Sequence, residues 1–377
     1  MIYWEIFCYL LAIGYALLIL IYFIGWLLIP SSLKGFRSQP THGFSVIVPA
    51  RNEALSIEKC LLGIIKQNYP KHLYQICVIN DHSTDNTLEK IEWVQQKFPG
   101  VSVQLINAET HGITGKKASI TLAVSMAKHP YIVLTDADCT RGEDWLSAID
   151  EHIQTRNSKM IYAPVFFGSG NLFEKAQSLE FAGLVGIGGA AIQLKNPNMC
   201  SAANLIFSKD AFNKVGAYEG NEHIASGDDE YLLHKIFKAY PNAVSFLKDQ
   251  RAIVKTSPNT TVDELAQQRR RWVSKSTKYE NRYITAILVG AYFYNVSMPL
   301  NLILGFWNPV FWTILLVQFG LKMFVEGLML GIVLKFFKET KLLLLLPLVQ
   351  PFHIFYVIVI GIWANVQTYT WKERELS

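Results

Sequence analysis

The stretch FSVIVPARNEALSIEKCLLGIIKQNYPKHLYQICVIN, residues 44–80, decides the fold. It opens on the apolar run Phe44–Val48, continues in a helical pattern over Ala54–Gln67 and closes on a second apolar run, Gln75–Ile79. Short β-branched runs bounded by polar turns are typical of buried strands, and a helix between two of them is typical of a βαβ unit. The stretch therefore predicts parallel strands joined by a crossover helix.

The same alternation continues along the chain. A helical pattern covers Thr84–Lys97, a strand Val101–Ile106, a helix Lys117–Ala127 and a further strand Tyr131–Thr135. Strands that alternate with helices predict an α/β fold, a mostly parallel sheet with helices on both faces. The ligand crevice of such a sheet lies at the carboxyl ends of its strands, so we expect functional polar residues directly after strands.

Both ends of the chain are apolar, and hydrophobic residues make up 51% of the sequence against 17% charged. From Tyr3 to Ile29 the only charged residue is Glu5, and the stretch is long enough to cross a bilayer. It lacks a basic start and a small-residue cleavage site, so we interpret it as a transmembrane helix and not a signal peptide. Lys34 and Arg37 follow it, which predicts that its C-terminal end is cytoplasmic.

Three more apolar stretches follow the α/β region: Tyr283–Trp307, Val310–Leu334 and Leu342–Val366. The middle one carries Lys322 and Glu326, whose i, i+4 spacing allows them to pair. Lys372 and Arg374 in the tail leave open whether the last stretch crosses fully or is re-entrant or interfacial. We predict an N-terminal transmembrane helix (1–30), a central domain (40–280) and a C-terminal transmembrane region (283–367). This describes a multi-pass protein of a bacterial inner membrane with a cytoplasmic catalytic domain.

Charge and cysteine content exclude other classes. The net charge is +5, and no Lys/Arg block interleaves with aromatic residues, so we expect no nucleic-acid partner. The five cysteines are scattered and odd in number, which predicts reduced, buried thiols and neither disulfides nor a zinc site.

Polar motifs follow the first two predicted strands. Backbone N–H groups of the turn Pro49–Glu53, with its carboxylate, can hold part of a nucleotide, although the turn could equally be capped by Asn52 or Glu53. In the segment Asn80–Asp85, Asp81 can accept hydrogen bonds from a base or ribose. We interpret Asp85 as a helix cap and His82 as a bystander.

Two motifs offer charged groups for a phosphate. The loop Gly112–Lys117 is not a Walker loop, but Lys116 could approach a base or a phosphate; a flexible loop with solvated lysines is the alternative. Asp136-Ala137-Asp138 follows an apolar strand directly. In an extended segment residues i and i+2 point the same way, so Asp136 and Asp138 are predicted to converge on one hard cation that neutralises a diphosphate.

Two later motifs have both a structural and a catalytic interpretation. The acids of Gly227–Glu230 stand at a predicted helix start, where they could serve the helix dipole or supply a general base. Gln268-Arg269-Arg270-Arg271-Trp272 precedes the membrane stretches. It could anchor the chain at the interface, or its arginines could bind a departing diphosphate. The glycine-rich stretch Phe173–Leu194 predicts a helix, either at the bilayer surface or in the core.

Taken together, residues 44–279 resemble the inverting family 2 glycosyltransferases of GT-A fold. Similar membrane members include ceramide glucosyltransferase and the processive cellulose and hyaluronan synthases. The motifs follow the family order: Pro49–Glu53 for P-x-x-N-E, Asn80–Asp85 for D-D-x-S-x-D, Gly115-Lys116 for G-K, Asp136–Asp138 for D-x-D, Cys200–Phe212 for the G-A-N strand, Asp228-Asp229 for E-D and Gln268–Trp272 for Q-x-x-R-W. Asn80 and Asp228 depart from the family pattern, which has an acid and a glutamate there.

The resemblance implies a role for each matching residue. Asp138, assisted by Asp136, would bind a divalent cation, Mg²⁺ or Mn²⁺, and Asp229 would be the catalytic base. The nucleotide-sugar-binding residues would be Pro49, Ala50, Glu53, Asp81, Lys116 and Asp136. The residues at the leaving group and acceptor would be Gln268, Arg271 and Trp272, and the stretch Cys200–Phe212 would line the acceptor side.

The predicted function is therefore the inverting transfer of a sugar from a nucleotide sugar to an acceptor held at the membrane. UDP is the family's usual nucleotide, and a lipid or glycan in the bilayer is the expected acceptor. The alternatives are a processive polysaccharide synthase, a non-catalytic membrane protein that retains the fold, and a nucleotidyltransferase that uses the same acid pair.

Overall fold

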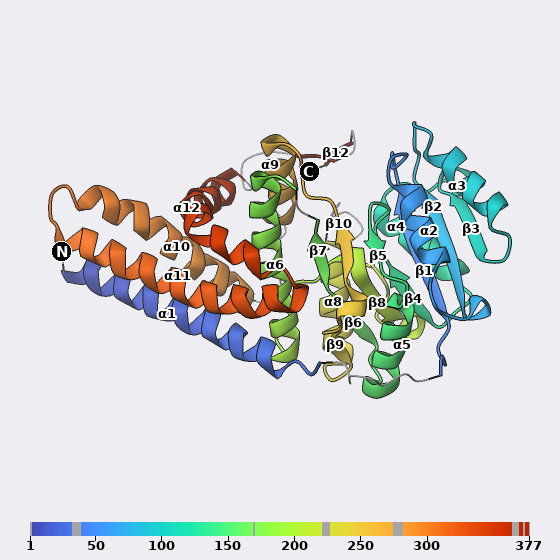
Figure 1. The fold of residues 1–377 in the computed structure, drawn as a ribbon, viewed down its shortest axis with the longest axis horizontal. Coiled ribbons are helices and arrows are strands. Elements are labelled where there is room, and N and C mark those ends of the chain that lie inside the picture. Colours follow the sequence, from blue (N-terminus) through green and yellow to red (C-terminus); the bar gives the residue numbers. More distant parts are fainter. Residues whose placement is uncertain are drawn as a thin grey trace. The chain divides into compact units, whose positions relative to one another are not determined.

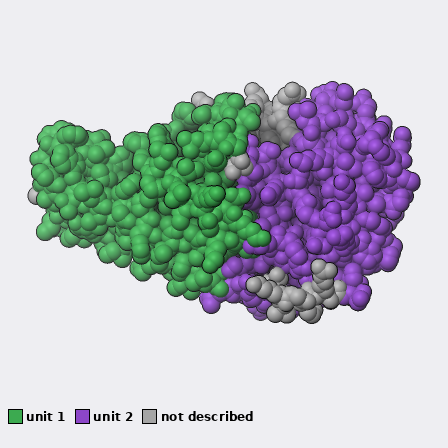
Figure 2. Space-filling view, viewed as in Figure 1, with its two compact units in different colours: residues 1–27, 169–190, 259–377 green, residues 28–168, 191–258 purple. Residues whose placement is uncertain are grey.

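The computed structural model describes residues 2–31, 39–168, 170–220, 227–273, 282–363, 369–371 and 374–376. Contacts divide the chain into two units (Figure 2). Unit 1 joins Met1–Leu27, Ser169–Ala190 and Asn259–Ser377, and unit 2 joins Leu28–Gly168 and Ala191–Pro258. This division differs from the predicted domain boundaries, which stay a prediction. Lys34 and Arg37, on which the predicted topology depends, lie outside the described residues.

Unit 2 is built on a seven-stranded sheet in the order β3-β2-β1-β4-β8-β6-β9. Its strands are β1 (Phe44–Ala50), β2 (Tyr74–Asn80), β3 (Ser102–Asn107), β4 (Tyr131–Leu134), β6 (Met160–Tyr162), β8 (Leu205–Ser208) and β9 (Val244–Phe246). Every neighbouring pair is parallel except those of β8, which runs antiparallel to β4 and β6. The predicted α/β class with a mostly parallel sheet is confirmed.

Crossover helices connect the four parallel strands β1 to β4 (Figure 1). They are α2 (Ile57–Ile65), α3 (Thr87–Lys97) and α4 (Lys116–Met126). Helices α2 and α3 contact each other, whereas α4 packs on β1 and β2. The chain runs outward from β1 to β3 and returns to β4 on the other side of β1, so right-handed crossovers put α4 on the opposite face from α2 and α3. The topological switch point therefore lies between β1 and β4, where ligands bind in such sheets.

A small sheet, in the order β5-β10-β7, completes the strands of unit 2. It consists of β5 (Thr140–Arg141), β7 (Val165–Phe167) and β10 (Val254–Thr256). The other helices are α5 (Trp145–Arg156), α7 (Lys209–Lys214), α8 (Asp228–Ala239), and the 3-10 turns η1 (Lys71–Leu73), η2 (Glu109–His111), η3 (Ala202–Asn204) and η4 (Gln250–Ala252). Strand β5 begins two residues after Asp138 and pairs with β10. This pairing fixes the position of the chain just after the Asp136–Asp138 motif.

Unit 1 is helical apart from one hairpin. Its elements are α1 (Ile2–Leu28), most of α6 (Leu172–Gln193), α9 (Val262–Val273), α10 (Arg282–Leu304), α11 (Val310–Phe337), η6 (Thr340–Leu345), α12 (Leu346–Trp363), β11 (Tyr369–Trp371) and β12 (Arg374–Leu376). Within the described ranges, four helical segments are long and apolar enough to cross a membrane: Ile2–Leu28, Tyr283–Leu304, Val310–Phe337 and Thr340–Trp363. They confirm the four predicted apolar helices. Whether the last one crosses fully stays open.

Polar groups inside these apolar helices satisfy one another. Lys322 is fully buried, and its Nζ lies 2.6 Å from Glu326 Oε1, which confirms the predicted pair. Tyr15 of α1 hydrogen-bonds to Glu326, and Gln350 of α12 donates to Glu326 Oε2 at 2.9 Å. Charged groups in an apolar environment are stable only when paired in this way, so the cluster joins three of the four long helices.

Helix α6 packs closely on α11. A Cβ atom added to Gly186 would lie 2.5 Å from Val333 and 3.0 Å from Met329, and one added to Gly183 would lie 3.3 Å from Leu330. Glycines let helix backbones approach closely, as is common between helices in membranes. The two interpretations of this stretch, a helix at the bilayer surface or in the core, both stay predictions.

Candidate active site

The turns after β1 and β2 are joined by hydrogen bonds. Asn52 N donates to Ser83 Oγ at 3.1 Å, and Thr84 N donates to Asn52 Oδ1 at 2.8 Å. Glu53 N donates to Thr87 Oγ1 at 2.8 Å. Asn52 has a positive φ of 52°, a conformation that a short polar side chain tolerates best. The two predicted nucleotide-binding turns thus form one connected edge of the sheet.

Asp81 lies at this edge and is buried. Its backbone N–H donates to the carbonyl of Ala50 at 2.9 Å, and Pro49 and Ala50 are the last two residues of β1. Its Oδ1 lies 2.9 Å from Nδ1 of His82, which the sequence had marked as a bystander. Arg51 Nη1 donates to the carbonyl oxygens of Asp81 and His82 at 3.0 and 3.2 Å. The structure therefore gives His82 a direct contact with the predicted nucleotide-binding acid.

Lys116 lies among the carboxylates of two separate motifs. Its Nζ lies 3.0 Å from Asp136 Oδ1 and 3.7 Å from Asp228 Oδ2. Burial lowers the pKa of Lys116, but Asp136, Asp228 and Asp229 raise it by more, so its net pKa is well above the ordinary value. The ammonium stays charged and holds the G-K loop, the Asp136–Asp138 motif and the start of α8 together. The sequence predicted each motif separately; the fold makes them one acid cluster around one lysine.

Asp138 is oriented by the small sheet. Thr256 Oγ1, at the end of β10, donates to Asp138 Oδ2 at 2.7 Å, and Cys139 Sγ lies 3.5 Å from Asp138 Oδ1. Burial and the negative charges of Asp136 and Glu53 raise the pKa of Asp138, whereas the hydrogen bond from Thr256 lowers it. The pKa is raised overall, so this carboxylate is a destabilised anion that a cation would stabilise.

The predicted extended geometry of the Asp136–Asp138 segment is wrong. Strand β4 ends at Leu134, and Cys139 N donates to the carbonyl of Asp136 at 3.2 Å, which closes a turn. The two carboxylates consequently contact different groups, Lys116 for Asp136 and Thr256 for Asp138. They still interact electrostatically through like charge, as the raised pKa of Asp138 shows.

Asp229 lies in the first turn of α8, and two backbone N–H groups orient its carboxylate. Ala202 N donates to Oδ2 at 3.1 Å and Glu230 N donates to Oδ1 at 2.9 Å. Two donors on two different oxygens fix the plane of this carboxylate. Ala202 belongs to the stretch that the resemblance assigned to the acceptor side.

The donor set fits a hard divalent cation bound together with substrate. Within the described residues, no three His, Cys, Asp or Glu side chains are grouped so as to hold an ion by themselves. Mg²⁺ in phosphate-transferring sites is usually held by one or two carboxylates plus the substrate's phosphates and water. Asp138, with its raised pKa, and the nearby Asp136 are carboxylates of that kind.

The Gln268–Trp272 motif lies in α9 of unit 1. Gln268 Oε1 accepts hydrogen bonds from Asn259 Nδ2 at 3.0 Å and from Arg269 Nη1 at 2.7 Å. Trp272 packs on Phe181, with the ring centroids 5.9 Å apart. The roles expected of Gln268, Arg271 and Trp272 toward the leaving group and acceptor stay predictions.

Sequence reasoning missed Thr256 and Arg269. Thr256 contacts Asp138 across 118 positions of the chain, and it stands outside every recognised motif. Arg269 occupies a variable position of Q-x-x-R-W, so the motif gave it no role. Asn204, in the stretch assigned to the acceptor side, has a structural task, since its amide bridges the carbonyls of Pro164 and Ala252 and accepts from Trp145.

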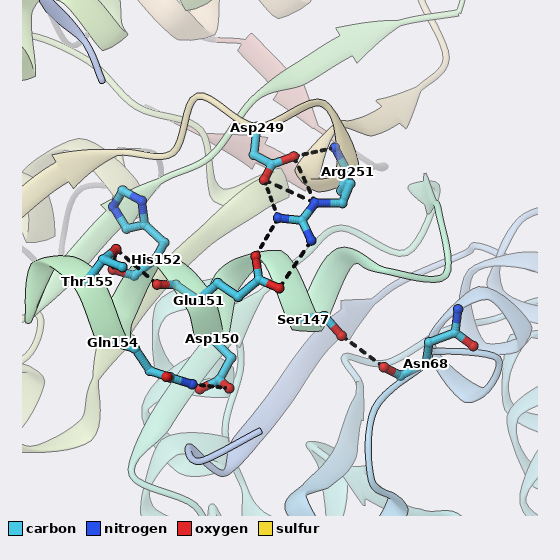
Figure 3. Close-up of polar contacts among 9 residues, drawn as sticks. All are labelled: Asn68, Ser147, Asp150, Glu151, His152, Gln154, Thr155, Asp249 and Arg251. Carbon is cyan, nitrogen blue, oxygen red and sulfur yellow. Dashed lines mark hydrogen bonds and ion pairs between the residues drawn. The ribbon is translucent and has the colours of Figure 1, made fainter. Parts of the chain in front are cut away.

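A separate charged cluster holds α5 against η4 (Figure 3). Arg251 Nη2 lies 2.6 Å from Glu151 Oε2 and 2.7 Å from Asp249 Oδ2. Arg251 contacts none of the predicted site residues in these interactions. The cluster is therefore a structural ion pair, and it offers a control for the arginine discussed below.

A mostly parallel α/β sheet with carboxylates and a lysine gathered at its edge is the architecture of a GT-A domain. The family model described as "Glycosyl transferase family 2" matches residues 45–216, and this part of the chain is a domain of that family.

Similar proteins agree with that assignment. The chain is 26% identical over 192 residues to "Glycosyltransferase AglE" of Haloferax volcanii, covering 49% of this chain and 58% of that protein. It is 25% identical over 221 residues to the "Dolichyl N-acetyl-alpha-D-glucosaminyl phosphate 3-beta-D-2,3-diacetamido-2,3-dideoxy-beta-D-glucuronosyltransferase" of Methanococcus voltae, covering 53% and 65%. The chain thus spans less than two thirds of either relative.

A solved structure shows the same fold along nearly the whole chain. It is the mannosyltransferase PcManGT of Pyrobaculum calidifontis in complex with GDP-Man and Mn²⁺, with a TM-score of 0.56 and 16% identity, covering 96% of this chain and 99% of that one.

Proposed function

We propose that this chain is a metal-dependent, inverting glycosyltransferase that transfers a sugar from a nucleotide sugar to an acceptor held at the membrane. The observation that carries the proposal is the acid cluster around Lys116. It unites three motifs, from the ends of β4 and the starts of α4 and α8, at the sheet edge where α/β folds bind ligands.

On the donor side, the proposal assigns the nucleoside to the joined turns after β1 and β2. Glu53 and Asp81 supply carboxylates there, and backbone N–H groups near the start of α2 favour an anion. Asp138, assisted by Asp136, would hold a divalent cation, which when bound would neutralise the charge of the leaving diphosphate. Lys116, which keeps its positive charge, can add to that neutralisation.

On the acceptor side, Asp229 accepts the proton of the attacking hydroxyl. The acceptor oxygen then forms its bond to the anomeric carbon as the bond from that carbon to the diphosphate oxygen breaks, which inverts the configuration. Backbone donors from Ala202 and Glu230 fix the carboxylate, so little reorganisation is needed when the proton arrives. Gln268 and Arg271 would contact the leaving diphosphate, and Trp272 would shape the acceptor site.

Four long apolar helices among the described residues support a multi-pass protein with a membrane-held acceptor. The proposal places its catalytic domain in the cytoplasm. The Methanococcus relative is named as a transferase acting on a dolichyl-phosphate-linked sugar, which also favours a lipid acceptor. UDP is our proposed nucleotide, and GDP is the alternative to test beside it because a GDP-mannose complex has the same fold.

The proposal is tested by replacing Asp229 with Asn in the full-length protein in lipid nanodiscs. Asn keeps an oxygen for the Ala202 N–H group but is not a base, so turnover should fall about 10²–10⁴-fold while nucleoside diphosphate binding is retained. The matched control is Glu89→Gln, an exposed acid in the first turn of α3 outside every motif, which should keep wild-type turnover. Turnover of Asp229→Asn close to that of the control would refute the assignment.

Two further measurements complete the test. Chelation with EDTA should abolish transfer, and Mg²⁺ or Mn²⁺ should restore it. Mass spectrometry of lipids from cells with and without the gene should reveal a lipid heavier by one hexose or N-acetylhexosamine. A ladder of products would instead identify a processive synthase.

A further inference from the structure

Arg269 is a buried cation within the Gln268–Trp272 motif, at a position to which the motif assigns no role. It is only 2% exposed, and it pairs with Glu180 of α6. Burying a guanidinium costs desolvation free energy, which only well-placed partners offset. The groups that contact Arg269 therefore indicate its role.

The guanidinium binds two groups at once. Its Nε and Nη2 lie 3.3 and 2.8 Å from the two carboxylate oxygens of Glu180, a bidentate pair between α9 and α6. Its Nη1 donates to Gln268 Oε1 at 2.7 Å. Tyr356 of α12 also hydrogen-bonds to this pair. The planar fork of arginine makes such a three-nitrogen arrangement possible, and a lysine could not reproduce it.

The contact with Arg269 determines which way the Gln268 amide points. A guanidinium has only donors, so the Gln268 atom that it meets must be the carbonyl oxygen. Asn259 Nδ2 donates to the same oxygen at 3.0 Å. Asn259 is itself held in place, because its backbone N–H donates to Gln177 Oε1 at 3.0 Å. With the oxygen held by two donors, the two N–H groups of Gln268 are directed away from Arg269.

The same arginine fixes the last residue of the motif. Its Cζ lies 4.2 Å from the centroid of the Trp272 ring, within the range of a cation–π interaction. Gln268 and Trp272 are therefore both oriented by one side chain, although they lie on successive turns of α9.

We propose that Arg269 is a positioning residue for the transfer reaction: clamped by Glu180, it presents the N–H groups of Gln268 to the substrate and fixes the Trp272 ring. This rests on the proposed function, in which Gln268 and Trp272 contact the donor's diphosphate and the acceptor. It predicts that Arg269 acts only through these two residues.

A double-mutant cycle tests this in the full-length protein. Arg269→Lys and Gln268→Ala should each lower kcat/KM for the nucleotide sugar about 10- to 100-fold, the range expected for one hydrogen bond to a charged group. The double variant should lose clearly less activity than the product of the two single effects, because the part of the Arg269→Lys effect that passes through Gln268 is already lost, whereas the part that passes through Trp272 remains. Effects that multiply in the double variant would overturn the proposal.

Arg251→Lys is the control, because Arg251 is also held by carboxylates, in its case two (Figure 3), but contacts no motif residue. It should lower the melting temperature, by less than Arg269→Lys because its side chain is 31% exposed, while leaving kcat/KM at the wild-type value. If Arg269→Lys has the same kcat/KM as Arg251→Lys, Arg269 is merely structural and the proposal is wrong. A wild-type protein that transfers from neither UDP- nor GDP-sugars would refute the proposed function itself, which is a distinguishable result.

Discussion

Replacing Gly186 by alanine tests the packing of α6 on α11. The added Cβ would lie 2.5 Å from Val333 Cγ2 and 3.0 Å from Met329 Cε. Met329 can move its flexible end. Val333 is fully buried and β-branched, so it is held near a single rotamer in its helix and must be displaced by about 1 Å to restore an ordinary contact.

Two opposing contributions set the change in the free energy of unfolding. Overpacking of this kind costs about 1–3 kcal/mol, and exchanging glycine for alanine inside a helix returns about 0.5–1 kcal/mol. Gly320→Ala on α11 is the matched control, because nothing lies within 4 Å of its added Cβ and only the second term applies. The two variants should therefore differ by the overpacking term, about 1–3 kcal/mol, with Gly186→Ala the less stable.

The assay is thermal unfolding of the detergent-solubilised full-length protein. The difference should appear as a melting temperature for Gly186→Ala several degrees below that of Gly320→Ala. In a Val333→Ala background the clash is removed, so Gly186→Ala should there be neutral or stabilising. Equal melting temperatures for Gly186→Ala and Gly320→Ala would show that α6 does not pack on α11 in this way.

Two other predictions concern buried charge. Lys322→Met leaves the Glu326 carboxylate without its ammonium partner, so it should destabilise the protein by about 3–5 kcal/mol, measured by thermal unfolding. The double variant Lys322→Met/Glu326→Gln should recover most of this loss. A double variant as unstable as the single one would contradict the prediction. Burial first, and then Arg156, lower the pKa of His152 to about 4 from its ordinary value near 6.5. The folded state therefore favours neutral His152, and this contribution is present above pH 6.5 and is lost as the pH falls toward 4, by up to about 1.4 kcal/mol per pH unit. His152→Gln should lose less stability than the wild type between pH 7 and 5 in urea unfolding, and identical losses would refute the pKa shift.

Local patterns predicted most of the secondary structure, because burial of short apolar runs and helical periodicity are encoded within a few residues. Helices α2 and α3 begin three residues later than predicted. The reason is that the residues before them belong to turns: the carbonyl of Glu53 accepts from Ser56 N and Ile57 N, and Asp85 Oδ1 accepts from Thr87 N. The two turns also hold each other, since Ala54 N donates to Asp85 Oδ2 at 3.1 Å and Thr84 N donates to Asn52 Oδ1 at 2.8 Å, and these bonds link residues more than 30 positions apart.

The sequence by itself determined the α/β class, the four apolar helices and the candidate acids, since each rests on a local pattern or on residues adjacent in the chain. Only the tertiary structure decided that Lys116 joins Asp136 to Asp228, and that Thr256 and Arg269 orient motif residues. Lys116 and Asp228 are 112 positions apart in the chain, and Thr256 and Asp138 are 118 positions apart. Strand order and helix packing bring such residues together, and no local spacing encodes them. Even Arg269, adjacent to Gln268, owes its orientation to Glu180 on another helix, 89 positions away.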